Sequence, residues 1–398
     1  MSVNVLEKER CTGCCACSNV CPKDCINMET DREGFVYPLI DEDKCIKCNL
    51  CNKACPVLNK VAVEENKKEP DVYAAWSLDE EIRLNSTSGG IFSELALKFM
   101  EDGGYLCGAQ YGDNHHIEHC IVNTREGLDK IRQSKYAQSD KGQVYRDIKK
   151  LLSDGGKVLF CGTPCECAGL LNYIGNKNDN LFIIDFICRG SNSPKVYEKF
   201  LCYLEEKYNS KIKKVWFKNK TYGWNRFSTK VEFENGESYL EDRNNDIYIV
   251  GYIKHNLYMR PSCADCIYRG LPRVSDITLA DFWGVKMSDE DLDIEKGTSL
   301  VMVNSQRGSM LFDRIKENIY HEKKTLNDTL EKNPSIMTSP VMNPKRQYFF
   351  ENLDNKPFDK LAEECFKEKF SFKRMISRAM PKKIKHRLKK MYKYNKYK

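Results

Sequence analysis

The sequence has no apolar run long enough to cross a lipid bilayer. Its longest buried-looking stretch is LFIIDFIC, residues 181–188, whereas a membrane-spanning helix needs about 20 predominantly apolar residues. The first ten residues, MSVNVLEKER, also lack the apolar segment and the small-residue cleavage site of a signal peptide. Both absences argue against a membrane-spanning or secreted protein, and we expect a cytoplasmic protein whose thiols start reduced.

Cysteine is the residue that the sequence holds in excess. The chain has 398 residues, enough for two or three domains, and 20 of them are cysteines. Such a number is typical either of a secreted disulfide framework or of metal sites in a reducing compartment. Because no secretion signal is visible, we interpret the cysteines as metal ligands or as core residues.

Eight of the cysteines repeat one spacing. CTGCCACSNVCP, residues 11–22, and CIKCNLCNKACP, residues 45–56, both follow C-x2-C-x2-C-x3-C-P, the run of bacterial ferredoxins. In this run the first three thiolates bind one cluster and the fourth binds the other cluster. The spacing therefore predicts two [4Fe–4S] clusters, one held by Cys11, Cys14, Cys17 and Cys55 and the other by Cys45, Cys48, Cys51 and Cys21.

The alternatives to these clusters are zinc binding and cysteines that only pack. Zinc sites usually use paired C-x2-C knuckles set well apart, rather than a repeated three-cysteine run with a trailing Cys-Pro. The repeat therefore favours the clusters. Cys15 and Cys25 lie outside the pattern, and we interpret them as small core residues.

The chain continues far beyond a ferredoxin domain, which would end near residue 60. We divide it into a ferredoxin-type domain at 1–60, a charged linker at 61–71, two further units at 72–155 and 156–340, and a tail at 341–398. Alternating strand and helix patterns fill the middle of the chain. The strands are expected within 71–77, 105–111, 116–124, 157–162, 181–188 and 213–219, with a hairpin at 226–241 that turns at Asn235 and Gly236. The helices are expected within 88–104, 142–156, 163–175 and 193–208, with a glycine stop at Gly103 and an N-cap at Ser193.

These patterns predict an α+β or α/β fold. A small ferredoxin-like N-terminal domain precedes a mixed α/β body, and a basic helical or disordered tail follows. Two glycine-rich stretches, STSGG at 86–90 and FCGTPC at 160–165, stand where helices begin and have the composition of phosphate cradles. The alternative is an ordinary turn with a helix cap, and the spacing alone favours that alternative.

Six further stretches carry a family resemblance. STSGG, RQSKYAQS, FCGTPC, DFICRG, PSCADCIY and VSDITLADFWG occur in this order between about residues 72 and 305. In this order they resemble the β subunit of coenzyme F420-reducing hydrogenase and of related dehydrogenases. The preceding double ferredoxin module is similar to that of bacterial members and of the chlorophyll-modifying reductases in the same family. Within the resemblance, 72–155 and 156–340 correspond to the N-terminal and C-terminal domains of the β subunit.

The resemblance implies a flavoprotein whose body binds FAD beside an iron–sulfur cluster. A flavin links two-electron hydride chemistry to the single-electron steps of clusters. The implied flavin-binding residues are Ser86, Thr87, Ser88, Gly89, Gly90, Lys135, Tyr136, Gly162 and Thr163. Lys135 is also a candidate catalytic residue that faces the pyrophosphate or the charge that develops on the flavin, and its alternative is a solvated surface lysine.

Asp281 in ADFWG is the second candidate catalytic residue. Members of the family carry a polar residue at this bend near the active site, and the adjacent Trp283 is a candidate for stacking on a planar group. The alternative is a turn aspartate beside a core tryptophan, which the residue types alone favour slightly.

The resemblance also implies a third [4Fe–4S] cluster in the body. Its ligands would be Cys165, Cys188, Cys263 and Cys266. A structural zinc at the same residues and isolated buried cysteines are the alternatives. Cys161 and Cys167 are not counted as ligands. Glu166 stands where relatives often carry glutamine, which we expect to alter what lies over the flavin.

The end of the chain is strongly basic. Residues 367–398 contain 14 Lys or Arg against a single Glu, interleaved with aromatic and aliphatic residues. Such a composition suits an anionic membrane surface or an acidic partner, which would place the protein peripherally at a membrane. The alternative is a solvated disordered tail. We do not expect nucleic-acid binding, because no other part of the chain supports it.

These features predict an iron–sulfur flavoprotein oxidoreductase. It would pass electrons between a redox carrier protein, or a deazaflavin or nicotinamide cofactor, and an organic substrate through its clusters and FAD. By analogy with family members that accompany surface-polysaccharide synthesis, a sugar-linked substrate is one hypothesis. The alternatives are a non-catalytic electron-transfer subunit that serves a partner enzyme, and a redox sensor or scaffold with no flavin.

Overall fold

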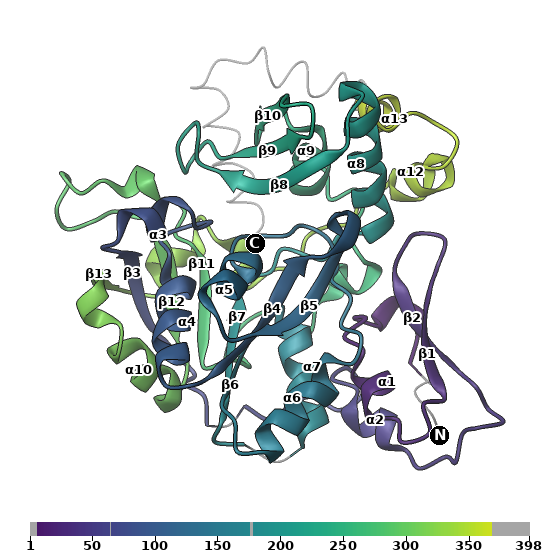
Figure 1. Cartoon of the computed structure of the whole chain (residues 1–398), viewed down its shortest axis with the longest axis horizontal. Coiled ribbons are helices and arrows are strands. Elements are labelled where there is room, and N and C mark those ends of the chain that lie inside the picture. Colours follow the sequence, from purple (N-terminus) through teal and green to yellow (C-terminus); the bar gives the residue numbers. More distant parts are fainter. Residues whose placement is uncertain (1–5, 64, 176–177, 368–398) are drawn as a thin grey trace, which may run out of the picture.

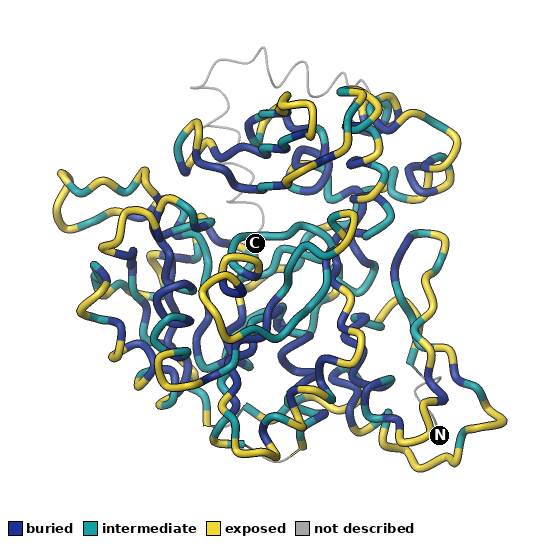
Figure 2. Tube along the Cα trace, viewed as in Figure 1, coloured by how far each residue is buried: buried dark blue, intermediate teal, exposed yellow. Residues whose placement is uncertain are grey.

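The computed structural model describes residues 6–63, 65–175 and 178–367. Figure 1 shows three parts: a small N-terminal domain at one side, a body built on a large sheet, and a smaller lobe above that sheet. Figure 2 shows that the buried segments concentrate in the strands and helices of the body and the lobe, while the loops around the N-terminal domain are largely exposed.

The N-terminal domain is built from two similar halves. Its elements are η2 (Lys8–Arg10), α1 (Ala16–Val20), β1 (Ile26–Thr30), β2 (Val36–Ile40) and α2 (Leu50–Ala54). β1 and β2 pair in antiparallel fashion. Each short helix follows a left-handed residue, Cys15 (φ 62°) before α1 and Asn49 (φ 66°) before α2. Cys15 and Asn49 therefore occupy equivalent positions in the two halves. Because the second half has asparagine there, the position does not require a cysteine ligand, as expected for a residue outside the ligand pattern.

The body contains one eight-stranded mixed sheet in the order β13-β3-β12-β11-β7-β6-β4-β5. Its strands are β3 (Asp71–Ser77), β4 (Tyr105–Tyr111), β5 (Ile117–Val122), β6 (Val158–Gly162), β7 (Leu181–Phe186), β11 (Ile277–Asp281), β12 (Ser299–Val303) and β13 (Ile319–Lys324). β11, β7, β6 and β4 run parallel, and the outer strands are antiparallel to their neighbours. Strands from both expected units, 72–155 and 156–340, contribute to this sheet.

Helices cover both faces of the sheet. One face packs against α4 (Ile91–Glu101), α5 (Arg125–Ile131) and α10 (Gln306–Asp313). The other face packs against α6 (Val144–Ser153) and α7 (Pro164–Ile174). α1 and α2 of the N-terminal domain rest on α7, because Cys14, Ala16 and Ala54 share the core of that face. The N-terminal domain is thus joined to the body by a packed apolar contact.

The upper lobe has its own small sheet and core. Its elements are α8 (Pro194–Tyr208), β8 (Ile212–Asn219), β9 (Ser228–Phe233), β10 (Ser238–Asp242), α9 (Ile247–Ile253), α12 (Arg346–Asn352) and α13 (Phe358–Phe366). Aromatic side chains dominate the core, and Phe35 from the N-terminal domain inserts into it. The remaining short elements are α3 (Glu80–Leu84), η3 (Asp113–His115), η4 (Pro261–Asp265), η5 (Ile294–Lys296), η6 (Lys316–Asn318), α11 (Asn327–Leu330) and η7 (Pro334–Ile336).

The observed fold confirms the expected class, a small ferredoxin-like domain followed by a mixed α/β body. The N-cap at Ser193 is confirmed, since its side chain accepts a hydrogen bond from Val196 N. The hairpin turn is confirmed too, with Gly236 at φ 88° between β9 and β10. Residues 346–352 and 358–366, which the sequence placed in the tail, form α12 and α13 against the lobe. Most of the basic segment, residues 368–398, lies outside the described residues.

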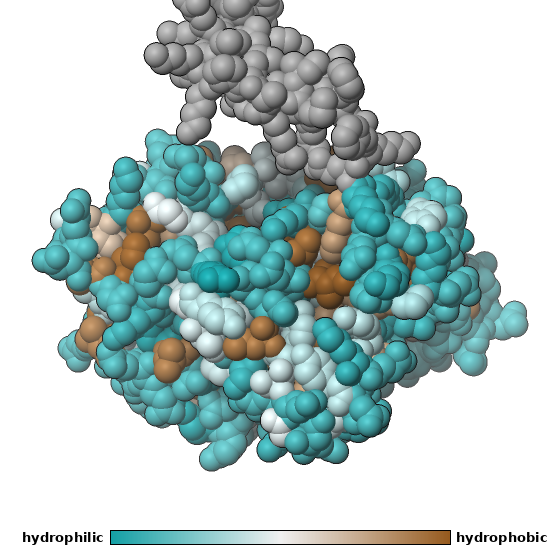
Figure 3. All heavy atoms as spheres, turned by 90° about the horizontal axis from the view of Figure 1, so that it is seen from above, coloured by the Kyte–Doolittle hydropathy of each residue, from teal (hydrophilic) through white to brown (hydrophobic). Residues whose placement is uncertain are grey.

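None of the helices in the described ranges is both long and apolar enough to span a membrane. Figure 3 views the molecule from above the lobe, where the visible face is mostly hydrophilic with separate hydrophobic patches.

Candidate iron–sulfur and flavin sites

The first predicted set of cysteines lines one small cavity of the N-terminal domain. Cys11, Cys14, Cys17 and Cys55 all border it. Burial raises the pKa of the Cys14 thiol, and the neighbouring Cys55 raises it further. The fourth thiol therefore arrives from the second half of the domain, which is the exchange that the ferredoxin spacing predicts.

The second predicted set lines a neighbouring cavity. Its cysteines are Cys21, Cys45, Cys48 and Cys51. Cys48 is exposed, whereas Cys21 is buried, so this cavity lies toward the surface. Cys25 also borders it, with its Sγ 3.3 Å from Cys21 Sγ. Across the described chain, no group of three or more His, Cys, Asp or Glu side chains is arranged to hold a single metal ion.

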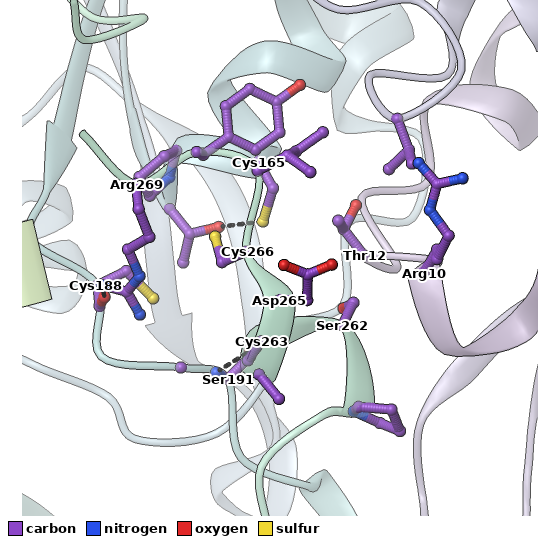
Figure 4. Close-up of a pocket in the computed structure, with 18 of the residues that line it drawn as sticks. Arg10, Thr12, Cys165, Cys188, Ser191, Ser262, Cys263, Asp265, Cys266 and Arg269 are labelled. Carbon is purple, nitrogen blue, oxygen red and sulfur yellow. Dashed lines mark hydrogen bonds between the residues drawn. The ribbon is translucent and has the colours of Figure 1, made fainter. Parts of the chain in front are cut away.

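The third predicted set meets where the body faces the N-terminal domain. Cys165, Cys188, Cys263 and Cys266 line a cavity of about 320 Å³ together with residues 7, 9, 10 and 12. Figure 4 shows these cysteines entering from separate segments, with Arg10 and Thr12 of the N-terminal segment across from them.

Each of these four cysteines lies at the end of an element. Cys165 stands in the first turn of α7, Cys188 follows β7, and Cys263 lies in η4 just before Cys266. Burial raises the pKa of Cys188 to about 12, and the nearby Cys263 and Cys266 contribute to the rise. Ser191 N donates a hydrogen bond to Cys263 Sγ (3.3 Å). The donor set fits a cluster that bridges three segments.

Tyr268 lies between the first and third sets of cysteines. Its side chain is 6% exposed, and its hydroxyl donates to the carbonyl of Pro56 (2.6 Å). Burial raises its pKa, and thiols of both sets, including Cys14 and Cys165, add to that rise. Thr12 and Val57 border both cavities, so the two sites share a wall.

The largest of the candidate sites is a cleft of about 650 Å³ at the carboxyl ends of the parallel strands. The ends of β6, β7 and β11 form its floor, and the lobe contributes its upper wall. Ligands of α/β proteins bind at this edge of a sheet, and the volume suits a cofactor. Cys188 borders both this cleft and the third cysteine site.

The start of α4 opens into this cleft. Gly90 is the N-cap, at φ 90°, and no side chain caps the helix. Gly90, Ile91, Phe92 and Ser93 all line the cleft. Because the first N–H groups of a helix have no intrahelical acceptor and carry the positive end of the dipole, this end can bind a phosphate.

The hydroxyls of STSGG are largely engaged within the protein. Ser86 Oγ donates to Ile82 O (2.7 Å) and Ser88 Oγ donates to Thr298 O (2.8 Å). Thr87 Oγ1 accepts from Ser134 N (2.9 Å), which ties this loop to the RQSKY segment. The loop therefore offers its backbone and the helix end to a ligand, rather than free hydroxyl donors.

Gly89 lies behind the wall of the cleft rather than on its surface. Its N–H donates to Ser299 Oγ (2.9 Å) and its carbonyl accepts from Ser77 N (2.7 Å). A Cβ here would lie 2.4 Å from Ala75 O. Glycine is thus required for close packing against the sheet, and the other eight predicted flavin residues line the cleft.

The start of α7, in contrast, is already capped. Thr163 and Glu166 form a capping box, in which Glu166 Oε2 accepts from Thr163 N (2.9 Å). Glu166 also pairs with Lys141, whose side chain is fully buried. Of the two glycine-rich stretches, only STSGG precedes a helix, α4, whose first N–H groups are free of a side-chain cap and can bind an anion. The GTPC stretch instead positions Cys165 in the first turn of the capped helix α7.

The Glu166–Lys141 pair gives a pH-dependent contribution to stability. Burial alone would raise the pKa of Glu166, but Lys141 and His119 lower it to about 2. Because the ordinary value is 4.5, the stabilisation is present above pH 4.5 and is lost as the pH falls toward 2. Lys141 has a raised pKa, so its contribution persists through neutral pH.

Replacing Lys141 with methionine is expected to lower the free energy of unfolding by about 3–5 kcal/mol, because it leaves Glu166 buried without a counter-ion. Urea unfolding of the anaerobic protein measures this loss. The double variant Lys141→Met, Glu166→Gln should recover most of it. A double variant that is no more stable than Lys141→Met would show that the loss does not come from the unpaired carboxylate.

Lys135 lines the cleft but is held by the end of a helix. Its Nζ donates to the carbonyls of Lys130 (2.9 Å) and Arg132 (2.8 Å), at the C-terminus of α5. Burial lowers its pKa to about 7. Tyr136 beside it packs its ring against Phe217, with centroids 5.3 Å apart. A flavin contact of Lys135 stays a prediction.

Asp281 also lines the cleft and is ion-paired. It forms a salt bridge with Lys218 and accepts from Trp224 Nε1 (2.7 Å). Trp283 stacks on Trp224, with ring centroids 4.8 Å apart and planes 9° apart. One face of Trp283 is thus already occupied, and a catalytic role of Asp281 stays a prediction.

Sequence reasoning missed several residues that shape these sites, among them Lys218, Lys220 and Tyr268. Lys218 is the partner of Asp281, and Lys220 donates to Ser88 O (2.6 Å) beneath the STSGG loop. Neither lysine lies in a motif, so no sequence signal marks them. Tyr268 follows the CADC pair by two residues, and that position was a usable signal.

Two family models match the sequence. Residues 10–59 match the 4Fe-4S dicluster domain, and residues 155–329 match the C-terminal region of the coenzyme F420 hydrogenase/dehydrogenase beta-subunit family. Residues 155–329 are therefore similar to the C-terminal region of this beta-subunit family, and a 4Fe–4S dicluster domain precedes them in the chain. The dicluster match confirms the iron–sulfur domain that the cysteine spacing predicts. The beta-subunit match confirms the family resemblance, and its range contains four of the six motifs, FCGTPC, DFICRG, PSCADCIY and VSDITLADFWG.

Among the solved structures that are similar to this protein, one contains a chain that covers most of its length. It is a structure of the F420-reducing [NiFe] hydrogenase complex from Methanosarcina barkeri, and the identity between the two chains is 18%. The similarity covers 77% of this chain and 91% of that chain, with a TM-score of 0.45. No curated protein matches the sequence.

Proposed function

We propose that the protein transfers electrons between a carrier protein at its N-terminal domain and a flavin in the large cleft. The observation that carries this proposal is the adjacency of the four sites. The first and third cysteine cavities share Thr12 and Val57, and the third shares Cys188 with the cleft. The two N-terminal sets share one apolar core.

In this proposal [4Fe–4S] clusters would supply single-electron steps and FAD would couple them to two-electron chemistry. Three sets of four cysteines would hold the clusters. The open end of α4 would bind the flavin pyrophosphate, with Tyr136 and Gly162 on the wall of the cleft. Tyr268, which is buried and bonded to the Pro56 carbonyl, would limit the access of water between the first and third sets.

The carrier would approach at Cys48, the exposed member of the second set. The lining of that cavity includes Lys23 and Lys47 but no acidic residue, which suits an acidic one-electron carrier such as a ferredoxin. At the cleft, the family name supports coenzyme F420 as a two-electron partner, with a nicotinamide as the alternative. The chain would then act in the cytoplasm as an oxidoreductase subunit.

Two finer hypotheses rest on the sequence alone. Neither family match bears on a sugar-linked substrate in surface-polysaccharide metabolism, which stays a prediction. The membrane surface or acidic partner for the basic tail also stays a prediction, because residues 368–398 lie outside the described residues.

Anaerobic mixing with reduced ferredoxin tests the proposed route. The bound flavin of the wild-type holoprotein should be bleached, and Cys48→Ala should slow this bleaching by at least about tenfold, because it removes a ligand of the entry cluster. Cys202→Ala is the matched control, since Cys202 is exposed on α8 and belongs to none of the three sets. Equal rates in all three proteins would contradict entry at the second set.

A further inference from the structure

Arg260 is a buried cation with no carboxylate partner in the described part of the chain. It is 1% exposed, and none of the ion pairs among those residues includes it. Its Nε donates to Cys11 O (2.6 Å), one terminal nitrogen to Gln138 Oε1 (2.8 Å) and the other to Val36 O (2.9 Å). The guanidinium carbon lies 4.3 Å from the ring centroid of Tyr37. Each of its three nitrogens has a partner, but its charge is not neutralised by these neutral groups.

The position of Arg260 joins two sets of cysteines. Its side chain reaches the carbonyl of Cys11, in the first set, while its own carbonyl accepts from Cys263 N (3.0 Å), in the third set. Arg260 is also the N-cap of η4, which carries Cys263, so the side chain that docks on the N-terminal domain belongs to the same turn as a thiol of the third set.

The loop that carries Cys11 and Cys14 lies in close contact with the Arg260 guanidinium. Gly13 has φ 66°, and a Cβ added to it would lie 2.7 Å from an Arg260 terminal nitrogen and 2.4 Å from Gln138 Nε2. Gln138 Nε2 in turn donates to Thr12 O (3.2 Å). Glycine is needed here because Arg260 and Gln138 lie directly on the backbone of the ligand loop.

An uncompensated buried guanidinium is unfavourable unless a negative charge lies close to it. A [4Fe–4S] cluster with four thiolate ligands carries net negative charge, and its reduction adds one more. Nearby positive charge favours the reduced form and raises the reduction potential. The first cysteine set is the candidate for this compensation, because the Cys11 carbonyl in its loop accepts directly from Arg260 Nε.

We propose that Arg260 is the counter-charge of the cluster bound by Cys11, Cys14, Cys17 and Cys55, and that it raises the reduction potential of this cluster. The inference rests on the proposed function, since it requires a cluster at these cysteines. It makes Arg260 a positioning and tuning residue at the joint between the dicluster domain and the body, rather than a catalytic one.

A redox titration of the full-length anaerobic holoprotein, followed by electron paramagnetic resonance, tests the inference. Arg260→Gln should shift the midpoint potential of one N-terminal cluster to more negative values, whereas Arg260→Lys should retain most of the wild-type value. Arg346→Gln is the matched control. Arg346 also joins the N-terminal domain to the lobe, through Glu33, but its charge is paired with that carboxylate, and its Nε donates to Met259 O rather than to a cysteine loop.

A second variant keeps the inference testable if Arg260→Gln does not load iron. Gln138→Glu places a carboxylate on the guanidinium and neutralises it, so the same negative shift is expected. Potentials of Arg260→Gln or Gln138→Glu that equal the wild-type value, or a shift of the same size in Arg346→Gln, would overturn the inference. A wild-type protein without iron at the N-terminal cysteines would instead overturn the proposed function itself.

Discussion

Cys165→Ala is expected to remove about four irons per chain while about eight remain in the N-terminal domain. Cys165 contributes one of the four thiols in the cavity between the body and that domain. Without it, the third cluster would lack a ligand at the start of α7. Reduction of the flavin through the N-terminal clusters should slow by at least about tenfold, because the connecting site is lost.

Cys167→Ala provides the matched control for this experiment. Cys167 lies in the same helix two residues away and is fully buried, yet its Sγ faces the carbonyls of Gly162 and Ile184. The Cys167→Ala variant should keep all of its iron. Iron and sulfide analysis of both variants measures how much of the cluster each has lost. Unchanged iron in Cys165→Ala, or equal losses in the two variants, would show that Cys165 is not a cluster ligand.

Gly90→Asp is expected to abolish retention of FAD, with affinity reduced at least about tenfold, equivalent to about 1.4 kcal/mol. The substitution places a carboxylate at the uncapped start of α4, where the helix N–H groups would otherwise meet the pyrophosphate. The new side chain both repels the phosphates and competes for the same donors. Flavin released on denaturation and titration of the apoprotein with FAD measure the effect.

Two further glycine variants distinguish the effect of the added charge on FAD binding from the effect of backbone strain. Gly90→Ala carries the strain of φ 90° and a contact 3.0 Å from Ile82 Cγ2, but no charge. Gly103→Asp places the same acid at φ 73° at the opposite end of α4, in open space. Both should retain more FAD than Gly90→Asp. If Gly90→Asp binds FAD as well as Gly90→Ala does, the end of α4 is not the phosphate site.

Local sequence patterns predicted those helices and strands whose formation depends only on neighbouring residues. The apolar run in DVYAAWS and the glycine stop after α4 depend on residues close in sequence, and both elements form as expected. The pairing of distant strands was beyond such patterns. β3 lies between β12 and β13, more than 200 residues further along the chain, and no local spacing encodes that neighbour.

Spacing also explains which part of the site was predictable. Three of the four ligands in each N-terminal set recur at short intervals, so these cysteines were visible as a repeat, whereas the third set comes from three distant segments and was implied only by the family resemblance. The buried basic residues near these sites, by contrast, follow no regular spacing in the sequence. Lys141, Lys218 and Arg260 reach their partners from loops or strands far away in sequence, and only the folded chain reveals them.

The two phosphate-cradle candidates show the same limit. STSGG and FCGTPC have similar compositions, and the sequence did not separate them. The structure does, because Glu166 caps α7 whereas no side chain caps α4. The difference depends on one side chain three residues into a helix and on the buried Lys141 that stabilises it.

The most direct test of the account is one anaerobic preparation in which iron, sulfide, zinc and flavin are quantified together. The account predicts about twelve irons, a matching amount of sulfide, no stoichiometric zinc and about one FAD per chain. About eight irons with FAD would remove the third cluster and keep the flavoprotein. Eight irons without flavin, or zinc in place of iron at the body cysteines, would contradict the proposed electron route to the cleft.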